Sequence, residues 1–181
     1  EPPTGARKIE PGPFLSPENR ARPLSFVKLR IVALGHRMPA WVKAGYDEYA
    51  KRMPREFALE LVELKPEPRD RGRSVAQMLA AEAPRVRAAC VGCRTIALDE
   101  RGAAWTTQEL AANLARWHVD AMDAAFVIGS ADGLDSAVKR DAHARVALSP
   151  MTLPHGLVRV LLAEQLYRAV SLNAGHPYHR A

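Results

Sequence analysis

The chain has 181 residues, of which 48% are hydrophobic and 25% charged, as in a globular protein with a core of its own. It contains no apolar run of the roughly 18 residues that span a membrane, no secretory signal at its first residues and only two cysteines, so we expect a cytoplasmic protein without membrane contact or disulfide framework. Its net charge of +6 and pI near 9.7 favour a polyanionic partner, most simply nucleic acid.

The first 26 residues differ from the rest of the chain. They hold six of the 14 prolines and show no apolar period, so they cannot bury enough surface to offset their ordering entropy. The chain also begins with Glu1 rather than methionine. We expect residues 1–26 to be a disordered arm or an added upstream extension, and residues 27–181 to form one folded domain.

The folded part is expected to begin with a strand, a helix and a second strand. Residues 28–35 (KLRIVALG) are apolar up to a glycine and residues 57–64 (FALELVEL) alternate in polarity, which is typical of strands. Between them, residues 38–53 have helical spacing, with Pro39 suited to the first turn. One face of this helix is expected to be buried, with Trp41, Val42, Tyr46, Tyr49 and Met53 on it.

Two capping boxes predict the starts of the next helices. Ser74 with Gln77 begins the first, which Pro84 is expected to kink or divide. Thr106 with Glu109 begins the second, and its sequence continues as LAANLARWHVDAM.

Three more strands are expected at residues 94–99 (RTIALD), 124–129 (AAFVIG) and 145–149 (RVALS). A short helix is expected around residues 135–145, and a long final helix over residues 157–172. Strands that alternate with helices predict an α/β fold with a mostly parallel sheet flanked by helices.

The CVGC motif at residues 90–93 matches C-x-x-C. A zinc site would need two further ligands at matching spacing, and a redox dithiol would sit at the start of a helix rather than at its end. The favoured interpretation is a pair of small, partly buried side chains, and no metal site is expected.

Two loops follow strands at the edge where parallel sheets bind ligands. VIGSADGL (127–134) is bracketed by glycines that let a ligand approach the backbone, although it matches neither G-x-G-x-x-G nor G-x-S-x-G. ALSPMTLPHG (147–156) leads into the last helix, whose first amides could hold a polar ligand. Ordinary strand-to-helix loops remain the alternative for both.

The end of the chain carries groups suited to handling a nucleotide. In the last helix, Arg159, Glu164 and Arg168 lie among apolar residues, and exposed surface charge is the simplest interpretation. The tail HPYHRA (176–181) combines histidines, a tyrosine that can stack on a base and an arginine that can grip phosphate. A frayed chain end is the alternative.

Four stretches of the sequence resemble one known family. KLRIVALG, IGSADGL, LSPMTLPHGLVRVLLAEQLYRA and HPYHR are similar to the RlmH family, the small SPOUT-class methyltransferases that act on N3 of a pseudouridine in bacterial 23S ribosomal RNA. The resemblance spans residues 27–181, and Val27 stands where members of the family begin with methionine.

The resemblance implies a C-terminal trefoil knot, a homodimer, and S-adenosylmethionine bound by the knot loops without a metal. It also implies that the substrate is a nucleotide of 23S ribosomal RNA. We expect the enzyme to act on the assembled ribosome. The implied cofactor-binding residues are Leu98, Gly129, Ser130, Ser149, Pro150, Met151, Thr152, Leu153 and Pro154. The implied catalytic residues, part of them contributed to the partner's site by the tail, are Tyr178, His179, Arg180, Arg168, His155 and Glu164.

The chain departs from the family pattern at two places. It reads Gly-Ser-Ala-Asp-Gly at residues 129–133, where the family usually has Gly-Gly-Pro-Glu-Gly, and it has Gly156 where the family usually has proline. We expect a less rigid pocket rather than a loss of activity.

Two other function classes compete with the enzyme. One is a basic RNA- or ribosome-binding factor that keeps the fold but performs no chemistry. The other is a nicotinamide-dependent dehydrogenase, which the missing G-x-G-x-x-G disfavours.

Overall fold

The computed structural model describes residues 26–69 and 72–180, and of residues 179 and 180 only the backbone. Apart from Phe26, the expected N-terminal arm therefore lies outside the described residues. Five strands form one sheet in which every pairing is parallel, in the order β2-β1-β4-β3-β5. The strands are β1 (Val27–Leu34), β2 (Phe57–Leu64), β3 (Arg94–Ala104), β4 (Ala124–Ile128) and β5 (Ala144–Ala147).

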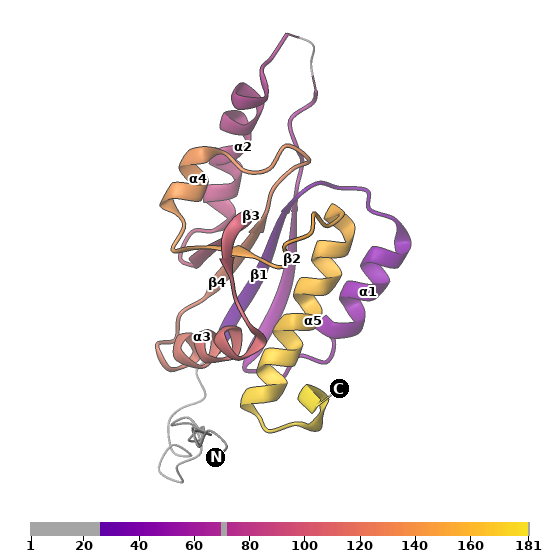
Figure 1. The fold of residues 1–181 in the computed structure, drawn as a ribbon, viewed down its shortest axis with the longest axis vertical. Helices are drawn as coiled ribbons and strands as arrows, with labels where there is room; N and C mark the ends of the chain where they lie inside the picture. The colour runs from indigo at the N-terminus through magenta and orange to yellow at the C-terminus, as the bar shows by residue number, and fades with distance from the viewer. Residues whose placement is uncertain (1–25, 70–71, 181) are drawn as a thin grey trace, which may run out of the picture.

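Helices cover both faces of the sheet (Figure 1). Helices α1, α3 and α5 pack on one face, and α2 and α4 pack on the other. The helices are α1 (Ala40–Ala50), α2 (Val75–Ala89), α3 (Thr107–Val119), α4 (Ser136–Asp141) and α5 (His155–Asn173), followed by a 3-10 turn, η3 (Pro177–Arg180). The expected α/β fold with a parallel sheet is confirmed. None of the described helices has both the length and the apolarity needed to cross a membrane.

Strand β1 shows how the sheet divides the core into two layers. Its side chains alternate between the faces, so Leu29 and Ile31 join the core under α3 and α5, whereas Val32 and Leu34 join the core under α2 and α4. Strand β4 is buried along its whole length, as its continuously apolar sequence predicts. The central strands contribute side chains to both cores. This packing fixes the positions of the carboxyl ends of these strands.

The two predicted capping boxes are present. The Ser74 and Thr106 hydroxyls accept the amides of Gln77 and Glu109, whose side chains accept the amides of Ser74 and Thr106 in return. These bonds satisfy backbone donors that a helix start would otherwise leave unpaired.

Two expectations about helices are wrong. Helix α2 is not divided at Pro84: it continues to Ala89, because Ala83 and Val86 on either side of the proline are buried in the core, and this packing holds the helix together. Trp41 is 55% exposed, because the buried stripe of α1 passes through Val42 and Tyr46. Pro39 occupies the N-cap of α1, one position before the expected first turn.

Strand β3 is longer than the expected residues 94–99 and contains a bulge. Its pairing with β5 shifts register between Leu98 and Ala103, so residues 99–102 leave the ladder. Gly102 passes so close to β5 that a Cβ atom there would lie 2.5 Å from the Val146 amide nitrogen. The bulge thus depends on a residue without a side chain.

We expect Gly102→Ala to lower the free energy of unfolding by about 2–3 kcal/mol, because the new methyl group must push β5 away from β3. Gly72→Ala is the control, since nothing lies within 4 Å of its added Cβ. Urea denaturation of both variants measures the effect, and equal midpoints would contradict the packing account.

Candidate functional site

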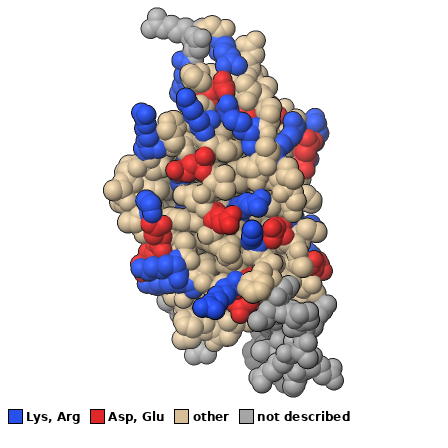
Figure 2. Space-filling model, turned by 180° about the vertical axis from the view of Figure 1, so that it is seen from behind, with Lys and Arg blue, Asp and Glu red and all other residues tan. Residues whose placement is uncertain are grey.

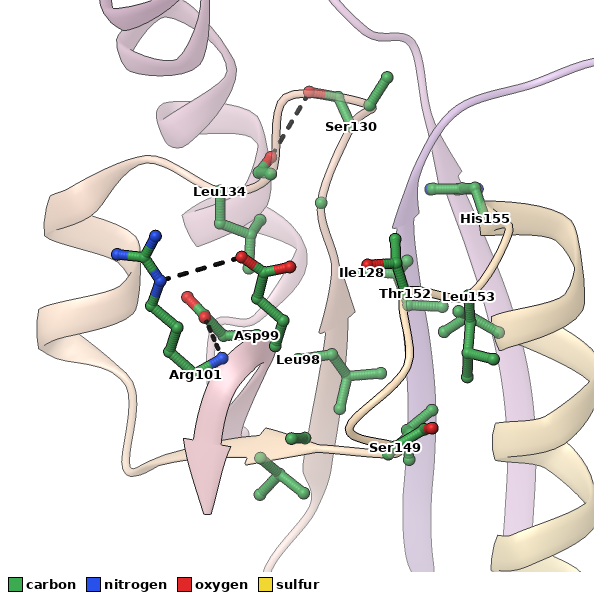
Figure 3. A pocket seen from close by; sticks show the side chains of 18 of the residues that line it. Leu98, Asp99, Arg101, Ile128, Ser130, Leu134, Ser149, Thr152, Leu153 and His155 are labelled. Carbon is green, nitrogen blue, oxygen red and sulfur yellow. Dashed lines mark hydrogen bonds and ion pairs between the residues drawn. The ribbon is translucent and has the colours of Figure 1, made fainter. Parts of the chain in front are cut away.

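A cavity of about 650 Å³ lies at the carboxyl ends of β3, β4 and β5 (Figure 3). Figure 3 shows Leu98 and Ile128 on neighbouring strands, with Ser149, Thr152 and Leu153 on the loop that runs from β5 to α5. Of the nine residues expected to bind a cofactor, seven line this cavity: Leu98, Gly129, Ser130, Ser149, Met151, Thr152 and Leu153. The other two, Pro150 and Pro154, are not among its lining residues.

The turn after β4 forms one wall of the cavity. Ser130 and Gly133 exchange backbone hydrogen bonds of 3.0 and 2.9 Å, and Gly133 adopts a φ of +93° that favours glycine. A Cβ atom on Gly129 would lie 2.4 Å from the carbonyl carbon and oxygen of Gly133. Both glycines of the sequence motif are therefore required by the turn itself.

Ser130 is bonded to the neighbouring helix. Its hydroxyl donates to Glu82 Oε2 at 3.1 Å, and Glu82, which is only 3% exposed, also accepts the Glu67 amide at 2.9 Å. Asp132 in the same turn pairs with Arg69 at 2.9 Å. The serine that departs from the family pattern thus ties the turn to α2 through a buried carboxylate.

The β3 bulge supplies the opposite wall, with charged residues that sequence reasoning missed. Asp99 accepts the Arg101 amide at 2.9 Å and pairs with Lys139 at 3.1 Å, and all three residues line the cavity together with Glu100. Burial raises the pKa of Asp99, but the Arg101 and Lys139 interactions outweigh it, so the net pKa is lowered and the carboxylate stays charged. The signal was present in the sequence, since Asp99 directly follows the apolar run of its strand.

His155 is the first residue of α5 and lines the cavity from the side opposite β3. Both ring nitrogens are buried without a well-oriented partner among the described residues. Burial lowers the pKa of this imidazole and the Arg159 charge lowers it further, although the Gly129 and Leu34 carbonyls nearby act in the opposite direction. The ring is therefore neutral at pH 7.

Arg159, one turn further along α5, is 1% exposed, so the interpretation of this residue as surface charge is wrong. Its guanidinium donates to the Gly35 carbonyl oxygen at 2.8 Å and pairs with Glu63. A Cβ atom on Gly35 would lie 3.2 Å from both Arg159 and the His155 ring. The glycine that ends β1 leaves room for both side chains.

Three of the expected catalytic residues form a second cluster on the second half of α5 and the turn that follows it. Glu164 accepts hydrogen bonds from the Tyr178 hydroxyl at 3.2 Å and from Arg168 at 2.8 Å, and the Arg168 guanidinium lies 4.9 Å from the centre of the Tyr178 ring. Burial, then hydrogen bonding with Tyr49 and the charge of Glu164, raise the pKa of Tyr178 to about 12. Glu164 and Arg168 are largely covered, so they too are not simple surface charges.

This cluster does not lie at the cavity of its own chain. Glu164 follows His155 by nine residues, about 13 Å along the helix axis, and Tyr178 lies beyond the far end of α5 (Figure 1). The structure thus brings seven of the nine expected cofactor-binding residues together with His155, and it groups Glu164, Arg168 and Tyr178 separately. The side chains of His179 and Arg180 are outside the described residues.

The cysteine pair shows no sign of reactivity. Cys90 is buried, and burial raises the pKa of its thiol to about 11. Cys93 accepts a hydrogen bond from Arg30 at 3.2 Å, and burial raises its pKa as well. Among residues 26–69 and 72–180, no group of three His, Cys, Asp or Glu side chains is arranged to hold a metal ion.

The family model described as "Predicted SPOUT methyltransferase" matches residues 27–179. The chain belongs to the SPOUT methyltransferase family. It is 58% identical to "Ribosomal RNA large subunit methyltransferase H" of Nitrosospira multiformis and 57% identical to the protein of that name in Burkholderia multivorans, in each case over 86% of this chain and the whole of the relative. The resemblance to the RlmH family is thereby confirmed, and the dehydrogenase alternative is wrong.

Two solved structures share the fold of this SPOUT protein at low sequence identity. A probable methylase family protein from Haemophilus influenzae aligns with a TM-score of 0.53 and 15% identity, over 85% of this chain and 70% of that one. A probable methyltransferase from Bordetella pertussis aligns with a TM-score of 0.50 and 20% identity, over 81% and 95%. These likenesses bear on the fold alone, and the trefoil knot stays a prediction.

We expect the stability of this protein to fall on acidification in a way that depends on His155. The folded chain binds a proton at His155 less readily than the unfolded chain, so this contribution is constant above the ordinary pKa of 6.5 and is lost as the pH falls below it. His155→Gln removes the titrating group and is expected to flatten the pH dependence of the free energy of unfolding.

Urea denaturation at about pH 7.5 and about pH 5.5 measures the difference. His36→Gln, which removes an exposed histidine from the same edge of the sheet, is the control. A drop in stability that is equally large in the His155→Gln variant would contradict the assignment.

Proposed function

We propose that this chain is a ribosomal RNA methyltransferase that transfers a methyl group from S-adenosylmethionine to N3 of a pseudouridine in 23S ribosomal RNA. The observation that carries the proposal is the 58% identity to a ribosomal RNA large subunit methyltransferase H over that relative's whole length, together with a cavity lined by seven of the residues expected to bind the cofactor. The non-catalytic binding factor is disfavoured, because such a factor has no need of this cavity.

The residues of the cavity fit S-adenosylmethionine. Its volume of about 650 Å³ lies within the usual range for small-molecule sites, about 300–1,000 Å³. The buried His155 nitrogens have no good partner in the described chain, which is the condition of polar atoms that await a ligand. The wall at the β3 bulge carries both charges, Asp99 and Glu100 beside Arg101 and Lys139, so it offers polar partners to a cofactor that itself carries charges of both signs.

In this proposal the two loops and the β3 bulge each contact a different part of the cofactor. The Gly129–Gly133 turn and residues 149–154 offer backbone groups, and Leu98 and Ile128 offer an apolar floor. The bound cofactor would supply an electrophilic methyl group, so no metal has to activate the reaction. Catalysis then depends mainly on holding the acceptor in line with that methyl group.

The acceptor nitrogen carries a proton, which has to be removed or moved as the nitrogen becomes a nucleophile. His155 is neutral and lines the cavity, so in our proposal its imidazole accepts or relays that proton. The raised pKa of Tyr178 keeps its phenol protonated, so it is suited to donate a hydrogen bond and not to act as a base. Arg168 would hold Tyr178 in place rather than grip a phosphate, since it is bonded to Glu164.

The distance between the cavity and the tail supports a homodimer in which each chain completes the other's site. Tyr178 lies at the opposite end of α5 from His155, so the tail of one chain is not available to its own cavity in this arrangement. Residues 178–180 of a second copy would then be placed next to the acceptor, as the RlmH resemblance implies. His179 and Arg180 are assigned to proton handling and phosphate binding on the same ground.

We expect the purified protein to bind S-adenosylmethionine saturably in a calorimetric titration. We also expect it to methylate large ribosomal subunits taken from cells that lack this enzyme, and naked RNA fragments more slowly, because the described residues form one methyltransferase domain without a separate RNA-recognition domain among them. Mass spectrometry of the digested RNA identifies the product. Cofactor binding without methylation of any ribosomal particle would favour the non-catalytic factor.

We expect Tyr178→Ala to lower turnover by about 100-fold while the affinity for S-adenosylmethionine stays nearly unchanged. Gly129→Ala is expected to abolish cofactor binding, because its methyl group collides with Gly133. In a 1:1 mixture of the two inactive variants after subunit exchange, one intact site in each mixed dimer should restore about a quarter of wild-type activity.

Tyr178→Phe keeps the ring but loses the hydrogen bond to Glu164. Comparing it with Tyr178→Ala therefore separates the contribution of the hydroxyl to turnover from that of the ring. Absence of any recovery on mixing, with both variants folded and dimeric, would contradict the shared site. A loss of cofactor affinity in Tyr178→Ala would contradict the role given to the tail.

A further inference from the structure

Helix α2 carries a carboxylate on its buried face. Glu82 is 3% exposed and lies one helical turn from both Met78 and Val86, which are buried as well. Removing a carboxylate from water is costly unless bonded partners replace the water. Glu82 is not among the residues that line the cavity assigned to the cofactor. Neither packing nor direct contact with the cofactor therefore accounts for a carboxylate at this position.

The partners of Glu82 are neutral groups from two other parts of the chain. Its Oε1 accepts the Glu67 backbone amide at 2.9 Å, and its Oε2 accepts the Ser130 hydroxyl at 3.1 Å. Two arginines of the same region, Arg73 and Arg85, pair with the Glu67 side chain. Glu82 thus links three segments, which are the loop after β2, helix α2 and the turn after β4.

The middle of the turn after β4 has few anchors of its own. Ala131 and Asp132 are exposed, and the first buried apolar side chain after β4 is that of Leu134. The Ser130–Gly133 backbone pair closes the turn upon itself but bonds it to no other element. Bonds from outside the turn therefore decide where its backbone lies relative to the cavity.

Two bonds of this kind differ in exposure. The Arg69–Asp132 pair at 2.9 Å lies on the surface, with side chains 65% and 31% exposed. Figure 2 shows charged side chains of both signs at this end of the molecule, near the grey residues at the top of the view. Solvent and salt screen such a pair, so it contributes little. The Ser130–Glu82 bond joins a hydroxyl to a carboxylate removed from water, which makes it the stronger of the two.

We propose that Glu82 is a positioning residue for the cofactor, because through the Ser130 hydroxyl it holds the turn after β4 where its groups meet S-adenosylmethionine. This inference rests on the proposed function and adds a residue outside the cavity that sets the affinity of the site. Gly129, Ser130 and Gly133 all line the cavity, so a shift of the turn displaces groups that would contact the cofactor. The buried carboxylate then serves the geometry of the site and not the stability of the fold.

Three variants separate positioning from stability. Glu82→Met keeps a side chain of similar length in the core but removes both acceptor oxygens, so Ser130 loses its partner. Glu82→Gln keeps an acceptor for the Glu67 amide and offers a donor to the Ser130 hydroxyl, so it is the conservative control. Arg69→Ala removes the exposed pair at the same turn and is the second control.

We expect Glu82→Met to weaken S-adenosylmethionine binding about tenfold in a calorimetric titration, at a free energy of unfolding no lower than that of wild type. Glu82→Gln and Arg69→Ala should bind the cofactor within about twofold of wild type. In the protein without cofactor, the Ser130 and Gly133 amides should exchange with deuterium faster in Glu82→Met than in wild type, because the turn that they close is less firmly held.

A double-mutant cycle tests whether Glu82 acts through Ser130. Ser130→Ala removes the same bond from the other side and should also weaken cofactor binding. In the Ser130→Ala background, adding Glu82→Met should change the affinity by less than about twofold, because the bond is already lost.

Steady-state kinetics give an independent measurement. On ribosomal subunits from cells that lack the enzyme, Glu82→Met should raise the KM for S-adenosylmethionine about tenfold at a nearly unchanged kcat. A purely structural role would instead lower kcat through loss of folded protein and leave that KM unchanged.

Wild-type cofactor affinity in Glu82→Met would overturn the inference and leave the proposed function intact. An equal loss of affinity with and without the Ser130 hydroxyl would also overturn it, since Glu82 would then act by another route. So would a Glu82→Met variant much less stable than wild type, because the carboxylate would then serve the fold. If the wild-type protein itself binds no S-adenosylmethionine, the proposed function fails, which is a different result from any of these.

Discussion

The buried guanidinium of Arg159 is the interaction on which the site depends. It lies one turn into α5, bonds the carbonyl of Gly35 where β1 ends, and pairs with Glu63 on β2. A buried charge is costly without such partners, so the start of α5 is confined to one position against these two strands. That position places the His155 ring beside the turn after β4, in the wall of the cavity. Burial lowers the pKa of the His155 imidazole, and the charge of Arg159 lowers it further.

The local patterns in the sequence were sufficient to predict the order of strands and helices and the two loops that line the cavity. Alternation and capping boxes predicted the strands and the helix starts, because both depend on residues close together in the chain. Pro84 and Trp41 were misjudged, because packing against distant elements decides whether a helix continues past a proline and which of its faces is buried. For the same reason Arg159 was taken for surface charge, although its partners lie about 100 residues away in the sequence.

The charged bulge of β3 is a second feature that local sequence patterns do not predict. Residues 99–102 look like the polar end of a strand, and only the register shift against β5 turns them toward the cavity. The two loops that line the cavity were expected from the sequence because a family resemblance marked them, and the strand-end rule supported both. A further cavity of about 400 Å³, at the carboxyl ends of β1 and β2, was not found, since its walls come from five separate segments with no motif in common.

The bond between Ser130 and Glu82 makes a residue of the turn and a residue of α2 depend on each other. A related chain with glycine at position 130 has no hydroxyl for the buried carboxylate, which is left with the Glu67 amide as its donor. Leaving a buried carboxylate short of donors is unfavourable, so glutamic acid on α2 and serine in the turn should be inherited and lost as a pair. We therefore expect relatives with serine at the position of Ser130 to have glutamic acid at the position of Glu82, and relatives with glycine there to lack it.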